Sequence, residues 1–269
     1  MFGTKLNYNS HFFISGQDGT PSARELSGVQ SVEIGYNNNA ITRNPLGYGQ
    51  GITTGSGPTE QQVSFSRYLI YDDPVLVFTG ASEVMKGSFN YDNNLCYGFE
   101  SGYLSSYSVN CAVGAVPSVN ASFVVHGEME TGINATGATN TDIFIPSQGS
   151  ITATCDNATT NRVIGFDYSL TTKKIPYYTI GVEGPAVVKH VPPIEYTASV
   201  QFDADTALLE DSYNFLGTGF SRTVTFTING RDGTAIQSLS IPNACLVGEQ
   251  IESSADGSVR ITVQYRGHL

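Results

Sequence analysis

Apolar residues alternate with polar ones along much of this chain of 269 residues, and this pattern constrains the fold more than any other feature. A period of two places alternate side chains on one face of a β-strand, so each run predicts a strand with one face in a hydrophobic core. The alternating runs lie at residues 32–36, 63–65, 107–113 and 119–125, and again at 164–170, 196–202, 224–228 and 259–265.

Composition and turn residues also favour β structure. The chain has 29 Gly, 11 Pro, 15 Tyr and 14 Phe, whereas only 14% of its residues are charged. Asn229–Gly233 and Ala255–Gly257 contain residues that accept positive φ, as tight hairpins require. A helical bundle is excluded, and we expect a mainly β fold.

Two segments are candidates for short helices. Asp205–Leu216 has Asp205 as an N-cap and Gly217 as a stop. Asp73–Gly80 has Pro74 in place for a first helical turn after an Asp73 cap, although its β-branched residues are equally compatible with a strand. We therefore expect about one short helix flanking a β-sandwich or barrel in each half of the chain.

Short matches recur in the same order in the two halves, which predicts two tandem copies of one β domain. Pro58 and Ser64 correspond to Pro193 and Ser199 at an offset of 135, and the other matches have offsets from 130 to 135. Those matches pair Phe13–Gly19 with Phe144–Gly149, Ile34–Tyr36 with Ile164–Phe166, Leu46–Gly49 with Tyr178–Gly181, Leu104–Ser105 with Leu239–Ser240, and Cys111–Gly114 with Cys245–Gly248.

The predicted domains are residues 1–130 and 142–269, joined by a linker at residues 131–141. Each copy also contains a Gly- and Pro-containing span, Gly47–Pro58 in the first and Gly181–Pro193 in the second. Loops of this length exceed what a hairpin needs, so we expect them to carry function.

The sequence contains no constellation that predicts an enzyme. The histidines His11, His126, His190 and His268 lack metal-ligand spacing, and a structural role is favoured over a catalytic one, although His is also the usual general base. Gly47–Gly51 lacks the Lys of a P-loop and the helix of a dinucleotide-binding turn. We predict no catalytic residue, no cofactor and no metal site.

Acidic residues gather in two places without the register of a calcium loop. In the first half they are Asp72 and Asp73 of the run Tyr71–Asp73. In the second half they are Asp203, Asp205, Glu210 and Asp211. We interpret both groups as loop ends and helix caps.

Cysteine usage and the first residues bear on the compartment. The chain has four cysteines, too few and too far apart to stabilise it through disulfide bonds, so we expect reduced thiols at Cys96, Cys111, Cys155 and Cys245. We also expect Cys111 and Cys245 to be buried at matched strand positions. Residues 1–8 do not resemble a secretory signal, and no apolar run approaches the roughly 20 residues that span a bilayer. We expect a soluble protein that acts where it is made.

The formal charge of −11 opposes binding to nucleic acid, because DNA-binding surfaces are basic. An acidic surface can nevertheless lie beside DNA if its task is to let the polymer pass without adhesion.

Several segments resemble the tail tube proteins of tailed bacteriophages over nearly the whole chain. The likeness consists of strand-and-turn texture rather than an active-site motif. It lies in Leu26–Val32 through Gly47, Tyr103–Val109 with Val113–Pro117, Ile241–Leu246, and Asp256–Gly257 before Val259–Val263.

This resemblance implies a β-sandwich or barrel with a flanking helix, in subunits that stack as rings around a lumen for the genome. Members with two tandem copies form trimers, which gives a pseudo-hexameric ring. Three such chains would carry 3 × −11 = −33 charges, and an acidic lumen would repel DNA. The implied partners are other copies of the chain, tape measure, terminator and baseplate proteins, and transiting DNA without specific binding. The implied location is the virion tail, assembled in the host cytoplasm, with no membrane partner.

Other functions remain open at this stage. The nearest is another ring protein of the same fold, such as a baseplate hub, distal tail or tail terminator protein. A carbohydrate-binding β-sandwich attachment module is disfavoured because the chain contains no Trp. A hydrolase that uses Asp or Glu has no acid–base arrangement at a defined spacing.

Overall fold

The fold is known from a computed structural model of the chain. It describes residues 10–37, 40–43, 46–47, 52–55, 60–70, 73–80, 83–92, 95–135, 137, 151–155, 158–160, 162–182, 184–203, 222–229, 235–253 and 258–269.

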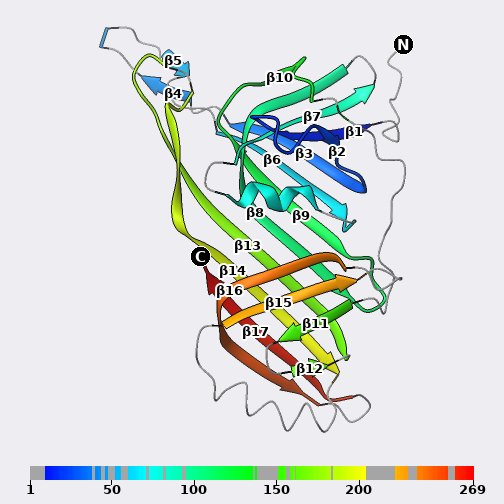
Figure 1. Ribbon diagram of the computed structural model, residues 1–269. Coiled ribbons are helices and arrows are strands. Elements are labelled where there is room, and N and C mark those ends of the chain that lie inside the picture. Colours follow the sequence, from blue (N-terminus) through cyan, green and yellow to red (C-terminus); the bar gives the residue numbers. More distant parts are fainter. Residues whose placement is uncertain are drawn as a thin grey trace.

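The described residues are mainly β, as the sequence predicted (Figure 1). The first half contains β1 (His11–Gly16), β2 (Arg24–Glu25), β3 (Val29–Asn37), β4 (Ala40–Arg43), β5 (Ile52–Gly55), β6 (Glu60–Tyr68), the 3-10 helix η2 (Pro74–Thr79), β7 (Met85–Asp92), β8 (Leu95–Ala112), β9 (Ser118–Val125) and β10 (Met129–Thr131). The second half contains β11 (Ile151–Cys155), β12 (Ala158–Thr160), β13 (Val163–Tyr177), β14 (Val187–Asp203), β15 (Arg222–Asn229), β16 (Ala235–Glu252) and β17 (Arg260–His268).

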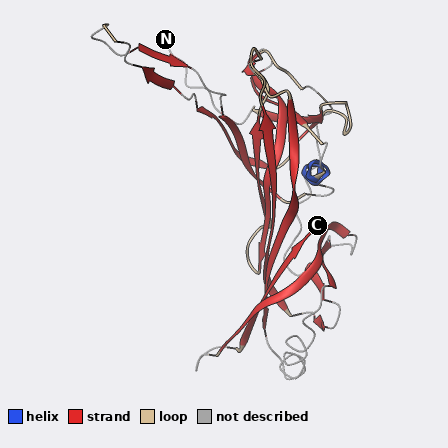
Figure 2. Cartoon of the chain, turned by 90° about the vertical axis from the view of Figure 1, so that its left-hand side faces the viewer, coloured by secondary structure: helices blue, strands red, loops and turns tan. Residues whose placement is uncertain are grey.

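Eight antiparallel strands lie side by side in the order β3-β6-β9-β8-β13-β14-β17-β16. The sheet continues from the first parts of β8 and β16, through β7, β1 and β2 in one half and through β15, β11 and β12 in the other. β10 pairs separately with the first part of β8, and β4 and β5 pair with each other. Figure 2 shows the long sheet nearly edge-on, with η2 on one side and the β4–β5 hairpin projecting from one end.

The two halves share one order of strand pairing. In the first half it is β3-β6-β9-β8-β7-β1, and in the second it is β13-β14-β17-β16-β15-β11, with every pair antiparallel. The strands also follow each other along the chain in the same sequence in both halves.

Irregularities in the ladders recur at matched places. The step between Leu104 and Ser106 in β8 recurs between Leu246 and Gly248 in β16, 142 residues later. The step between Val29 and Ser31 in β3 recurs between Val163 and Gly165 in β13, 134 residues later. Bulges are fixed features of a ladder, so they define which residues of the two halves are matched.

These registers agree with one sequence match and correct others. Ser64 and Ser199 hold matched places, opposite Ser122 and Gln264. By contrast, the residue matched to Ile34 is Tyr168 rather than Ile164. Ile34 is opposite Val63 in β6, and Tyr168 is opposite Ala198, the residue of β14 that is matched to Val63.

The same reasoning corrects two matches in β8 and β16. The residue matched to Leu104 is Leu246 rather than Leu239, and Cys111 is matched to Ser253 rather than Cys245. The offset rises from 135 at β6 and β14 to 142 at β8 and β16, because the second half has longer connections between these strands.

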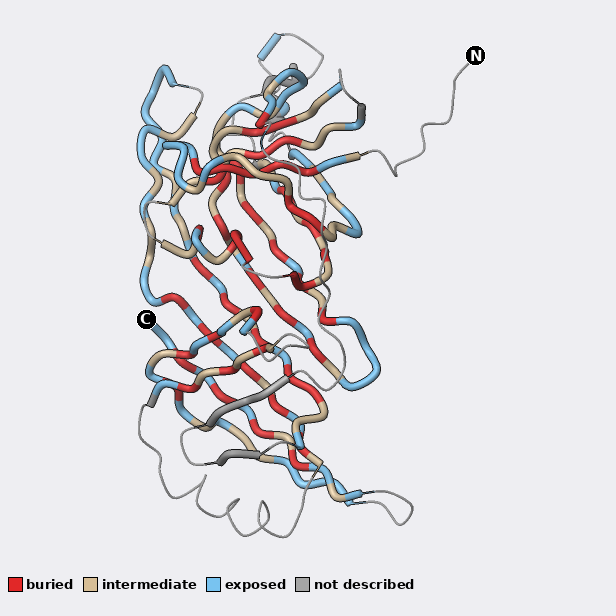
Figure 3. The backbone as a smooth tube through the Cα atoms, turned by 45° about the vertical axis from the view of Figure 1, so that its right-hand side comes forward, coloured by how far each residue is buried: buried red, intermediate tan, exposed pale blue. Residues whose placement is uncertain are grey.

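The core is one hydrophobic cluster that extends through both halves. Phe12 of β1 packs on Phe65 of β6 with ring centroids 5.4 Å apart, and Phe226 of β15 packs on Phe166 of β13 at 5.7 Å. The alternation predicted for residues 119–125, 196–202 and 224–228 is confirmed, and Figure 3 shows buried and exposed residues alternating along the strands. Val113 is an exception, because it is exposed in the turn after β8.

The first predicted helix is present as η2, with Pro74 in its first turn. Asp73 is its N-cap, and the Asp73 carboxylate accepts a hydrogen bond from the backbone N–H of Val75 at 3.0 Å. The cap and the proline ring together decide for a helix over a strand. The second predicted helix, Asp205–Leu216, lies outside the described residues.

Asp73 also neutralises a fully buried arginine. Its Oδ2 lies 3.3 Å from Nη2 of Arg67 and accepts a hydrogen bond from the hydroxyl of Tyr107 at 2.8 Å. The backbone N–H of Asp73 donates to Oε1 of Gln237 in β16 at 3.2 Å, which ties η2 to the second half. Burial and the adjacent carboxylate raise the pKa of Tyr107, so its hydroxyl remains a donor.

The two predicted long loops are partly strand. Ile52–Gly55 pairs with Ala40–Arg43 as a hairpin, and residues 187–193 begin β14, which pairs with β13 as far as Tyr177. Val187, Val188 and Val191 favour extended backbone, and the two prolines that follow lie where the pairing register shifts, which is where a sheet tolerates proline.

The start of the predicted linker is packed on the first half. Met129–Thr131 forms β10 against β8, and the backbone N–H of the buried Ala135 donates to Oγ of Ser88 at 3.0 Å. Residues 138–141 of the predicted linker lie outside the described part of the chain.

Replacement of Asp73 by Ala is expected to lower the free energy of unfolding by about 3–5 kcal/mol, because the Arg67 guanidinium would stay buried without its counter-charge. Chemical denaturation would measure the loss. Asp18→Ala, which removes an exposed carboxylate, is the control and should cost less than about 1 kcal/mol. Equal losses in the two variants would contradict this role of Asp73.

Candidate functional site: a polar sheet face with two open edges

The eight central strands present one face to the core and an opposite face, here called the polar face, whose side chains are mostly hydroxyl and amide groups. Residues of the polar face alternate with buried ones and lie in register across the strands. One row crosses seven neighbouring strands and consists of Ser31, Ser66, Asn120, Ser108, Ser169, Thr197 and Arg266.

Hydrogen bonds link these side chains across the strands. The hydroxyls of Ser31 and Ser66 are 2.7 Å apart, and those of Ser169 and Thr197 are 2.6 Å apart. At the junction of the two halves, the side-chain amide of Asn110 donates to the carboxylate of Asp167. The polar face is therefore rich in short polar side chains, several of which bond to each other.

Charges on the polar face are sparse and slightly acidic. Glu195 lies 3.3 Å from Arg266, and Asp203 lies 3.5 Å from Arg162. Among the described residues, the carboxylates that alternate with core-face residues in these strands are Glu33, Asp167, Glu195, Asp203 and Glu252, and the cations include Lys173, Arg260 and Arg266.

An open concavity of about 520 Å³ lies over the junction between β8 and β13. Ser108, Asn110, Asp167 and Ser169 contribute to its lining from the two paired strands. No cluster of three or more potential metal ligands occurs there or elsewhere among the described residues. Apolar groups of Val109, Tyr168 and Val247 also contribute to its lining, so the concavity is a shallow surface of mixed character.

Two strands of the central row each leave one edge unpaired within the described part of the chain. β3 pairs only with β6, and residues 245–252 of β16 pair only with β17. Unpaired N–H and C=O groups along such an edge can pair with another chain.

The matched strands inside the chain are paired on both sides. β8 pairs with β9 through Gly102–Asn110 and with β13 through Ser106–Ala112. β13 corresponds to β3, and β8 corresponds to β16. The edge of β13 that pairs with β8 is therefore the counterpart of the open edge of β3, and the edge of β8 that pairs with β13 is the counterpart of the open edge of β16.

Burial differs sharply between the matched strands. On the core face of β13, Tyr168 and Leu170 are 3% and 2% exposed, whereas Tyr36 of β3, the residue matched to Leu170, is 66% exposed. On the core face of β8, Val109 is 1% exposed, whereas the matched Ile251 of β16 is 54% exposed. The open edges therefore expose apolar side chains that the junction covers inside the chain.

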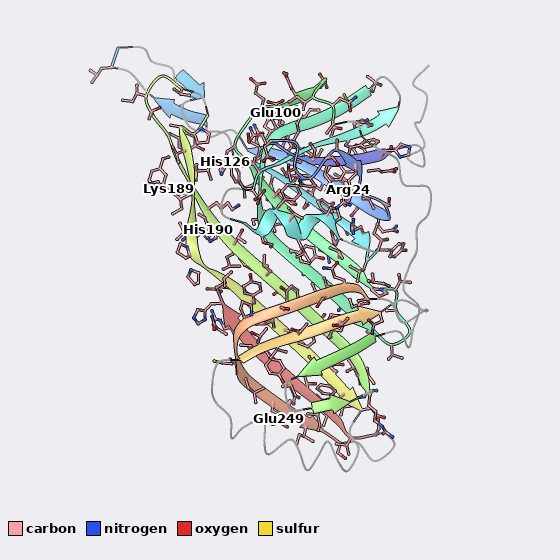
Figure 4. All side chains as sticks on the ribbon, in the orientation of Figure 1. Arg24, Glu100, His126, Lys189, His190 and Glu249 are labelled. Carbon is pink, nitrogen blue, oxygen red and sulfur yellow. The ribbon has the colours of Figure 1, made fainter. Side chains whose placement is uncertain are left out.

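The residues considered for chemistry do not converge. His126 follows β9 and His190 lies on β14, as Figure 4 shows, while His11 lies 2.7 Å from Glu25 on β2. Asp203 ends β14, whereas Asp205, Glu210 and Asp211, as well as Tyr71, Asp72, Tyr48 and Gly49–Gly51, lie outside the described residues. Asp73 has the structural role given above.

The prediction for the two matched cysteines was half right. Cys111 is buried, and burial raises the pKa of its thiol to about 12, which suppresses thiolate formation. Cys245 is exposed, because it follows the buried Ala244 and so points to the polar face. The cysteines whose side chains are described, Cys96, Cys111 and Cys245, are all free thiols.

Sequence reasoning did not identify β3 and β16 as strands with an open edge. One signal was available in residues 246–252, where Glu249 occupies a position that alternation assigns to the core face. The pKa of Glu249 is raised by burial, and its Oε1 is shielded from water without a hydrogen-bond partner in the described structure.

Comparison with known proteins yields no relative: no family model matches the chain, and no curated protein resembles it closely enough to count as a match. In the described part of the chain, no helix has both the length and the apolar character needed to cross a membrane.

The matched pair Val109 and Ile251 tests whether β16 is an open edge in the free subunit. Val109→Ser should lower the free energy of unfolding by at least about 2 kcal/mol, because it places a hydroxyl in the core, whereas Ile251→Ser should cost under about 1 kcal/mol. Denaturation is measured at concentrations where the chain is monomeric. A large loss for Ile251→Ser in the monomer would show that the edge is covered from within.

Proposed function

We propose that this chain is a structural subunit of a bacteriophage tail tube, in which three copies close into a ring and rings stack into a tube. The observation that carries the proposal is the pair of matched halves that end in complementary open edges. Joining β3 of one chain to β16 of the next repeats the connection that β13 and β8 make within the chain. A head-to-tail interface of this kind generates a closed ring when its rotation permits closure.

The proposal includes the interpretation that the two halves are copies of one tail-tube-like domain, at residues 1–130 and 142–269. The shared pairing order and the recurring bulges support it. Each ring of three chains would then contain six similar domains.

Strand geometry favours three chains over one or two. Three chains supply 3 × 8 = 24 central strands. With strands about 4.8 Å apart and tilted by about 40°, 24 strands close at a diameter of roughly 48 Å, 16 strands at roughly 32 Å and 8 strands at roughly 16 Å. Side chains remove about 10 Å, so one chain would leave almost no channel, two would leave roughly 22 Å and three roughly 38 Å, the widest passage for a hydrated duplex.

The polar face would line the lumen, because the core face is covered by η2, β1 and β15, which pack on β9, β6 and β13 respectively. Two of its carboxylates, Asp203 and Glu195, form ion pairs, and hydroxyl and amide groups predominate among its side chains. We therefore refine the expected acidic lumen to a largely neutral, weakly acidic lining. Such a surface would pass DNA because two of its described arginines, Arg162 and Arg266, are paired with carboxylates and so contribute little to phosphate binding by counterion release.

Other ring proteins of the same fold, such as a hub, distal tail or terminator protein, would use the same edges. Copy number separates them, since a tube subunit is present in many stacked rings per particle and the others in a single ring. A metal-dependent hydrolase has no supporting cluster of metal ligands among the described residues.

Electron microscopy of the purified protein tests the proposal. Rings with three-fold symmetry and a pseudo-six-fold outline, which stack into tubes at high concentration, are the expected result. Particles that stay monomeric in every assembly condition would contradict it.

Ile251→Lys is the matched variant for this experiment. A lysine on the open edge should prevent ring formation, because pairing would desolvate its charge, and it should leave the circular dichroism spectrum of the monomer unchanged. Lys in place of the exposed Val77 of η2, away from both edges, is the control and should still assemble.

A further inference from the structure

The β8·β13 junction has a defined register that serves as a template for an interface between chains. Tyr168 is opposite Val109, and Leu170 is opposite Tyr107. All four side chains are at most 3% exposed. The junction therefore joins two core faces into one continuous hydrophobic layer.

The matched residues transfer this register to the open edges. Tyr168 and Leu170 correspond to Ile34 and Tyr36 of β3, while Val109 and Tyr107 correspond to Ile251 and Glu249 of β16. We propose that β3 of one chain pairs antiparallel with β16 of a second copy, with Ile34 opposite Ile251 and the hydroxyl of Tyr36 donating to the carboxylate of Glu249. This inference rests on the proposed function, and it specifies the partner and the residues that set the register.

Burial at both edges supports a second copy as the occupant. Val32 and Ile34 already pack partly on the core, whereas Tyr36 and Ile251 are largely exposed in the free chain. Each edge has an apolar strip that continues a core layer, and no described strand flanks it as one flanks the matched strip inside the chain. An added strand of the same chain supplies that flank on both sides at once.

Glu249 gives the interface its specificity. Its Oε1 is shielded from water and accepts no hydrogen bond from any described residue, and Figure 4 shows Glu249 on β16 at the end of the molecule away from the β4–β5 hairpin. A carboxylate in this position needs a donor. Tyr36 has an exposed hydroxyl and occupies the place opposite Glu249 in the transferred register, so it supplies that donor.

One pair in the transferred register opposes the association. Glu33 would lie opposite Glu252 on the polar face, where Asp167 and Asn110 form a hydrogen bond inside the chain. Like charges directly opposite each other destabilise a strand pair. Arg260, which is opposite Glu252 in β17, offsets part of this repulsion. The interface between chains is therefore weaker than the internal junction and dissociates more readily.

Cysteine cross-linking tests the register. Ile34→Cys combined with Ile251→Cys, in a Cys245→Ser background that removes an exposed thiol, should form disulfides between chains under mild oxidation. Because β3 and β16 lie at opposite ends of the central row, the bonded products are dimers and closed trimers. The control is Ile34→Cys with Glu249→Cys, which is displaced by two residues to about 7–8 Å and should cross-link poorly.

The outcomes separate this inference from the proposed function. Rings that form without the expected cross-link, or that cross-link better through the displaced pair, overturn the register and leave the tube intact. Cross-linked oligomers that never become rings support the register and contradict the tube. The absence of both rings and cross-links overturns both.

Tyr36→Phe tests the hydroxyl contact. The protein concentration at half-assembly should rise about tenfold, because the variant loses a hydrogen bond to a charged group but keeps the aromatic side chain. Tyr91→Phe, at an exposed tyrosine of β7 away from both edges, is the control and should leave that concentration unchanged. An unaltered midpoint for Tyr36→Phe would exclude the proposed contact with Glu249.

Discussion

Backbone pairing between β8 and β13 is the interaction on which the rest of the structure depends. It joins two halves that share a pairing order, and it converts two edges into the middle of one sheet. Without it, four strand edges would expose unpaired N–H and C=O groups together with apolar core-face side chains. With it, the chain hides two of the four edges and retains the two that a neighbouring copy can satisfy.

Matched positions in the two halves have diverged according to their surroundings. Arg67 is paired with Asp73 in the core beneath η2, whereas the matched residue of β14 is the buried Phe202. Tyr107 donates to Asp73, whereas the matched Glu249 lies at an open edge. The internal junction is thus fixed by a buried network, while its counterpart between chains relies on one carboxylate and a strip of apolar side chains. Such a difference allows a stable subunit to associate reversibly.

Local patterns predicted the strands well because burial on one face imposes a period of two. The runs at 119–125 and 196–202, and the Asp73 cap with Pro74, were all identifiable from sequence. Register was harder to predict, because connections of unequal length shift the offset and leave only short matches such as Ser64 with Ser199. Cys245 was misjudged because it was assigned to the core by its match to Cys111 rather than by alternation from the buried Ala244. Ile251 was overlooked because its exposure depends on which strands lie alongside, and alternation within one strand carries no such information.

Hydrogen exchange of backbone amides, compared between monomer and assembled rings, tests the central claim most directly. Amides of β13 opposite Ser106–Ala112 should be protected in both states, because their partners lie in the same chain. Amides on the open edges of β3 and of residues 246–252 should exchange quickly in the monomer and become protected only on assembly. Fast exchange at both open edges in assembled rings would contradict strand pairing between chains as the basis of assembly.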